Sequence, residues 1–144
     1  MTNTPRTETN IDSNKHAYYE RLRNESNSLF YKMDYIDIYV AAAAIGYYNK
    51  QYEPIKCAKT SIGVMSLMSA NNPNLWIIKS IAIAVKGIGV LDDLKDVAAA
   101  VEGYANAGID HLIKFHETDE DEVYSMALKL MDVIEEEGIT QKSS

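Results

Sequence analysis

Two histidines near the acidic C-terminal part of the chain could supply ligands for a metal ion. His111 and His116 lie five residues apart and are followed by Glu117. On a helix this spacing directs the two imidazole rings to different faces, whereas the HExxH motif places its histidines one helical turn apart. The pattern favours a solvated acidic helix start, and we expect no metal ion. A small metal-dependent hydrolase that uses these three residues is an alternative.

The remaining reactive side chains do not form a catalytic pattern. Cys57 is the only cysteine, so it cannot form an internal disulfide, and we expect it to be buried and inert. The sequence has neither a GxSxG nucleophile motif nor a P-loop. Glu135 and Glu136 would need a cleft to act as an acid–base pair. We therefore expect no enzymatic activity and no cofactor.

A basic, tyrosine-rich turn, NKQYEPIKCAK at residues 49–59, is a candidate for binding nucleic acid. Cationic and aromatic side chains can together hold a nucleic-acid strand by charge and stacking. The candidate contact residues are Lys50, Lys56 and Lys59 in the turn, with Arg21 and Arg23 in the first helix. A solvent-exposed loop that happens to carry lysines is the simpler interpretation of the same residues.

The charge distribution restricts where such binding could occur. The chain of 144 residues has a net charge of −7, and its acids concentrate after Leu91, in LDDLKD and HETDEDE. An acidic surface repels phosphate, so the C-terminal half is unsuited to binding nucleic acid. DNA, if it is a partner, would contact the N-terminal half.

The short segment KGIGV, residues 86–90, resembles the phosphate-binding hairpin of a helix–hairpin–helix DNA module. Asp92 and Asp93 follow where the phosphate would lie, and their charge opposes phosphate binding. We expect this segment to be a turn that ends a helix.

Tyrosine is unusually frequent, with ten residues against two phenylalanines and one tryptophan. A tyrosine covers apolar surface while it keeps a hydroxyl group for hydrogen bonds, which suits contact surfaces. Tyr31, Tyr35 and Tyr39 are spaced one helical turn apart and would form one stripe, and Tyr104 lies among small residues in EGYANAG. We predict that these four tyrosines lie at a protein interface. Packing within the chain is the alternative.

Two helices are expected to lie at the centre of the fold. Residues 33–50 combine a run of alanines with two aspartates near the positive end of the helix dipole. Residues 73–86 follow a capping residue, Asn72, begin with proline and stop at Gly87. Because both segments are apolar on most sides, we expect protein to surround both of them.

The other elements complete an all-α prediction. Further helices are expected at residues 13–27, 92–108, 109–117 and 119–137, with a short helix at 60–68 or a strand at 55–58. The sequence has no strand pair joined by a hairpin turn and no internal repeat. We predict a compact, single-domain all-α bundle of five to seven helices over residues 13–138, with flexible tails at 1–12 and 139–144.

The sequence contains no segment suited to a membrane. The longest nearly uncharged run, residues 38–49, is shorter than the about 20 apolar residues that a transmembrane helix requires. The polar N-terminus lacks the apolar centre of a secretory signal. We expect a cytoplasmic protein without membrane contact.

Two segments together resemble a known family. YIDIYVAAAAIGYYNKQYEPI and VAAAVEGYANAGIDHL are similar to patterns in small accessory proteins associated with DNA phosphorothioation (Dnd-type) systems of bacteria and archaea. The resemblance implies a small component of a phage-defence or DNA-modification locus, one that bridges or regulates larger proteins. It brings no active-site residues with it.

We therefore predict a non-enzymatic helical accessory module that acts through protein–protein contacts, as a homo-oligomer or within a larger defence complex. A nucleic-acid-binding module that uses the basic turn is the first alternative, and the small hydrolase is the second.

Overall fold

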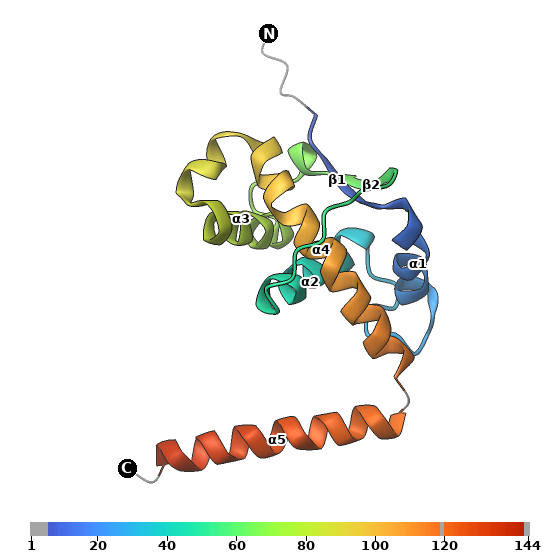
Figure 1. Cartoon of the computed structure of the whole chain (residues 1–144), viewed down its shortest axis with the longest axis vertical. Helices are drawn as coiled ribbons and strands as arrows, with labels where there is room; N and C mark the ends of the chain where they lie inside the picture. Colours follow the sequence, from blue (N-terminus) through green and yellow to red (C-terminus); the bar gives the residue numbers. More distant parts are fainter. Residues whose placement is uncertain (1–5, 119, 143–144) are drawn as a thin grey trace. The chain divides into compact units, whose positions relative to one another are not determined.

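A computed structural model describes residues 6–118 and 120–142 of the chain (Figure 1). In chain order the elements are β1 Glu8–Asp12, η1 Ser13–Lys15, α1 His16–Asn24, α2 Tyr35–Tyr48, β2 Lys59–Val64, η2 Met65–Leu67, α3 Pro73–Lys86, η3 Ile88–Asp92, α4 Leu94–Glu117 and α5 Glu120–Lys142, where η marks a 3₁₀ helix. The chain falls into two compact units, one ending at Ile113 and one beginning at Lys114.

The all-α prediction is wrong, because the described residues contain a two-stranded antiparallel sheet as well as five α-helices. β1 and β2 pair from Glu8 opposite Val64 to Asp12 opposite Lys59, with an irregularity after Thr9. Local patterns could not reveal this pair, because the two strands lie far apart in the sequence and no hairpin turn joins them. The sheet is anchored by one face of β1, where Thr9 and Ile11 are buried.

The predicted extent of the helical domain, residues 13–138, remains a prediction. Two elements nevertheless continue outside these limits. β1 occupies residues 8–12, where a flexible tail was expected, and α5 continues past Gly138, where the last helix was expected to stop. Residues 1–5 and 143–144 of the predicted tails, and Asp119 of the predicted last helix, lie outside the described residues.

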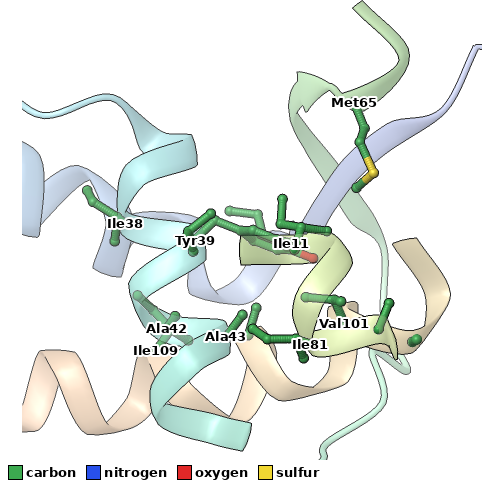
Figure 2. Close-up of a cluster of buried hydrophobic side chains, with 14 of the residues drawn as sticks. Ile11, Ile38, Tyr39, Ala42, Ala43, Met65, Ile81, Val101 and Ile109 are labelled. Carbon is green, nitrogen blue, oxygen red and sulfur yellow. The ribbon is translucent and has the colours of Figure 1, made fainter. Parts of the chain in front are cut away.

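α2 contributes to the core of the first unit, but the expectation that protein surrounds it is wrong, since Tyr48 is 84% exposed. The start of α2 is fixed by a capping box, in which the Asp34 side chain accepts from the backbone of Asp37 and the Asp37 side chain accepts from the backbone N–H of Asp34. Figure 2 shows α2 side chains among those of β1, η2, α3 and α4. The labelled members of this cluster are Ile11, Ile38, Tyr39, Ala42, Ala43, Met65, Ile81, Val101 and Ile109.

α3 begins and ends at the predicted residues. The Asn72 side chain accepts a hydrogen bond from the backbone N–H of Asn74, Pro73 occupies the first helical position, and Gly87 ends the helix with φ +88°. The expectation that protein surrounds this helix is wrong, however. Leu75, Ile78, Ile81 and Ala82 are buried, whereas Trp76 is 63% exposed.

α4 is one continuous helix where two were expected, because Gly108 does not end it. A Cβ atom on Gly108 would overlap the carbonyl oxygen of Ala42, and one on Gly46 would overlap the carbonyl oxygen of Tyr104. Glycine at these positions lets α2 and α4 cross at close range, which offsets the low helix propensity of glycine.

α5 belongs to the second unit of the chain. Large apolar side chains along its described part are exposed: Tyr124, Leu128, Leu130, Met131, Val133 and Ile134. None of the described helices has the length and hydropathy needed to cross a membrane.

Candidate functional site

The three lysines of the predicted basic turn lie in different settings. Lys50 and Lys56 are exposed in the irregular segment that connects α2 to β2. Lys59 begins β2, and its Nζ lies 2.7 Å from Oε1 of Glu102 on α4. The positive charge of Lys59 is therefore already paired. Among the described residues, no interaction connects Lys50 or Lys56 to Lys59.

The two arginines of α1 are held by local contacts. Arg21 forms an ion pair with Glu25 at 2.9 Å. Arg23 lies over the ring of Tyr35, 5.4 Å from its centroid, and donates a hydrogen bond to the carbonyl oxygen of Met33. The Arg23 contacts connect α1 to the start of α2, whereas the Arg21–Glu25 pair lies at the end of α1 itself. None of these contacts involves a residue of the basic turn.

The predicted tyrosine stripe runs from the surface into the core. Tyr31 is 42% exposed, with the ammonium group of Lys32 over its ring. Tyr35 is half-buried and meets the rings of His16 and Tyr19 edge-on. Tyr39 is buried in the core, so the stripe does not form a single exposed face.

Tyr104 lies in a cluster of three tyrosines within the first unit. Its ring meets the rings of Tyr47 and Tyr52 edge-on, at centroid distances of 5.7 and 5.1 Å. The smaller distance is to Tyr52, which comes from the predicted basic turn. The structure thus brings together one residue from each of two segments that the sequence singled out separately.

Two hollows in the surface meet at Tyr52, and we call them together the Tyr52 cleft. The larger, of about 770 Å³, is lined by Tyr104, Lys86 and Asp96 with an apolar wall from α3 and η3. The smaller, of about 450 Å³, is lined by charged side chains: Arg6, Glu8, Lys59, Lys95 and Glu102. Tyr52 and Ala99 line both hollows.

The Tyr52 ring is fixed in place by α4. A Cβ atom on Gly103 would overlap the ring, so the absence of a side chain there lets the ring lie directly on the helix. The Tyr52 hydroxyl donates a hydrogen bond to the carbonyl oxygen of Ala99. The backbone N–H of Glu53 donates a second hydrogen bond to the carbonyl oxygen of Gly103. Half of the tyrosine nevertheless remains exposed.

A polar network around Lys15 holds this turn against α4. The Lys15 ammonium group donates to Glu53, to Asp110 and to the carbonyl oxygen of Asn106. The Asn106 amide donates to the backbone carbonyl of Glu53. Burial lowers the pKa of Lys15, but hydrogen bonds and charge attraction from Asp110 and Glu53 outweigh it, so that the pKa is raised.

Sequence reasoning missed Lys15, Lys95 and Asn106, and it considered Lys86 only as the first residue of KGIGV, which was expected to be a turn. The only signal was Asn106 itself, a polar residue inside an apolar helix stripe, where a buried amide needs hydrogen-bond partners. The sequence did not indicate that the lysines lie near one another, because each comes from a different segment of the chain.

None of the predicted reactive residues lines the cleft. His111 hydrogen-bonds to the side chain of Gln51, while His116 and Glu117 belong to the second unit. Across the part of the chain that the structure describes, no three His, Cys, Asp or Glu residues are grouped as a metal site requires. Cys57 is exposed, so the prediction that it is buried is wrong; it lies in the connecting segment rather than in an element of the core.

Comparison with known proteins gives a match over almost the whole chain. A family model described as DNA sulphur modification system-associated protein 4 matches residues 9–143. No curated protein matches the chain, and no solved structure matches it.

Proposed function

From the premise that this chain belongs to the DNA sulphur modification system-associated protein 4 family, we propose that it is a non-enzymatic accessory protein that binds another protein of the modification system. The family association supports an accessory role in DNA modification. The non-enzymatic part rests on the sequence, which has no nucleophile, phosphate-loop or metal-binding motif. A cytoplasmic location and a role in phage defence belong to the same proposal.

An uncharged, exposed stripe on α3 is the observation that carries the proposal. The stripe consists of Pro73, Trp76, Ile77, Ser80 and Ala84, all exposed and spaced three or four residues apart, so that they share one helix face. Lys79 and Lys86 are the charged residues of α3, and neither belongs to the stripe. An apolar helix face of this kind is typical of helices that bind a groove on a partner.

Trp76 is the natural anchor of this surface. Its indole N–H donates to the carbonyl oxygen of Ala70 at 2.8 Å, which fixes the orientation of the ring. The side chain is still 63% exposed. Tryptophan dominates the binding energy of many interfaces, and a ring that is already oriented loses little conformational entropy on binding.

The charges of α3 favour a different protein over a second copy. Lys79 and Lys86 give this helix a positive charge without any acid. A second copy would present the same helix, which carries no acid to pair with these lysines. A partner with an apolar groove bordered by acidic side chains fits the stripe better.

The test is co-purification of the tagged protein with the other proteins of its modification system. Ala84→Glu places a charge in the stripe without removing a contact, and Ala17→Glu on α1 is the matched control, because Ala17 is also an exposed helical alanine. We expect the wild-type protein and the control to retain a partner and Ala84→Glu to lose it.

Three outcomes would contradict the proposal. The first is that none of the system's proteins co-purifies, and the second is that Ala84→Glu retains the partner as well as the control does. The third is a doubled native mass that Ala84→Glu abolishes, since it would show that the stripe binds a second copy instead.

A further inference from the structure

The Tyr52 ring offers a stacking surface that the fold has already positioned. Gly103 lies beneath it, Tyr104 meets its edge, and its hydroxyl group is bonded to the carbonyl oxygen of Ala99. A ring held in this way, with half of the residue exposed, can accept a planar group without first being ordered. Stacking on an aromatic side chain is the common way in which proteins hold an unpaired base.

Cationic side chains stand in both hollows beside this ring. Lys86 lines the larger hollow and Lys95 the smaller. In the smaller hollow Arg6 is paired with Glu8 and Lys59 with Glu102, whereas Lys86 and Lys95 form no ion pair with any described residue. Two ammonium groups are thus available for an anion, one in each hollow.

The charge of the cleft differs from that of the whole chain. The lining contains four cationic and three acidic side chains, whereas the chain has a net charge of −7. The positive excess is local and small, and Asp96 opposes it in the larger hollow. Phosphate would therefore bind here by a few direct contacts, and not through a broad basic surface.

We propose that the Tyr52 cleft binds a segment of single-stranded nucleic acid, with a base stacked on the Tyr52 ring and the phosphates on its two sides held by Lys86 and Lys95. A base inside a duplex is already stacked on both faces, so the cleft selects an unpaired strand. This site overlaps only part of the surface that the sequence suggested. Lys59 lines the smaller hollow, whereas Lys50 and Lys56 line neither.

The experiment measures fluorescence anisotropy of a labelled single-stranded oligodeoxynucleotide of about ten residues, a length within the usual site size. At low salt we expect saturable binding, and two phosphate contacts predict a slope of log K against log salt of about −1.4. The double variant Lys86→Gln/Lys95→Gln should weaken binding about tenfold or more. The double variant Lys50→Gln/Lys56→Gln removes the same charge outside the cleft and should bind as the wild type does.

Two further variants test stacking without changing the charge. Gly103→Ala displaces the ring from α4 and should abolish most of the binding, while Tyr52→Phe keeps the ring and should retain it. Circular dichroism of each variant checks that the fold is intact. The proposal is overturned if the single strand does not bind at low salt, if duplex DNA binds as tightly, or if the two double variants weaken binding equally.

Discussion

A Cβ atom on Gly108 would overlap the carbonyl oxygen of Ala42, which means that α4 and α2 cross with their backbones in direct contact. The same crossing brings Gly46 against the carbonyl oxygen of Tyr104, so glycine is required on both helices. The small residues of the segment EGYANAG therefore have a packing role inside the first unit. The crossing also fixes the part of α4 that supports the Tyr52 ring.

Gly108→Ala should destabilise the protein strongly. The added methyl group meets backbone and not a movable side chain, so the two helices must separate, and we expect a loss of about 3 kcal/mol or more, at the upper end of overpacking costs. Urea denaturation followed by circular dichroism measures the change. Gly89→Ala is the control, because a Cβ atom there meets nothing within 4 Å. Equal stability of the two variants would show that the helices are not in close contact.

Thr9→Val should stabilise the protein. The Thr9 side chain is buried on β1, and its hydroxyl group has no hydrogen-bond partner among the described residues. Valine keeps the shape and removes the unsatisfied group, which is worth about 1 kcal/mol. Thr60→Val on β2 should have the opposite effect, because the Thr60 hydroxyl is hydrogen-bonded to that of Ser13 at 2.7 Å. The free energies of unfolding of both variants test these two predictions. A lower free energy of unfolding for Thr9→Val than for the wild type would contradict the first.

Lys15→Met should loosen the turn that carries Tyr52. The side chain of Lys15 is 13% exposed, and its removal leaves Glu53 and Asp110 without their shared cation. Because both carboxylates are about half exposed, the expected loss of stability is modest, about 1–2 kcal/mol. Hydrogen exchange of the Glu53 amide, which donates to the Gly103 carbonyl, should become faster. Arg6→Met removes the exposed pair with Glu8 and should leave both quantities unchanged.

Ionisation of the Tyr39 hydroxyl should contribute to the unfolding of the protein at alkaline pH. Burial is the main cause that raises the pKa of Tyr39, and the nearby charge of Glu102 raises it further above the ordinary value of 10.0. The neutral phenol therefore stabilises the folded state fully below pH 10, and this stability is lost as pH rises from there toward the raised pKa. Tyr39→Phe should move the alkaline unfolding transition to higher pH. Tyrosinate absorbance together with circular dichroism would detect it, and an unchanged transition would exclude Tyr39 as a cause.

Local signals were sufficient for the bounds of α3, whereas α2 runs over residues 35–48 and not over the predicted 33–50. Asn72, Pro73 and Gly87 set both ends of α3, and Asp34 with Asp37 set the start of α2. A cap acts through residues only two or three positions apart, so it can be read from the sequence without knowing the fold. The family resemblance, carried by the segments around α2 and α4, is confirmed by the match over residues 9–143.

Several features that the sequence did not predict join distant segments. β1 pairs with β2 across about fifty residues, and Gly108 lies inside a helix only because α2 lies against it. Likewise, the exposure of Trp76 depends on which elements cover α3 and which do not.

By itself, the sequence determined where α3 starts and ends, that most of the chain is helical, and to which family the chain belongs. Only the tertiary structure decided that Tyr52 lies on Gly103 with Lys86 and Lys95 beside it. The physical reason is the separation along the chain over which each effect acts. Helix propensity and capping act over a few neighbouring residues, whereas a cleft forms where segments meet after the chain has packed, and its position depends on every contact between them.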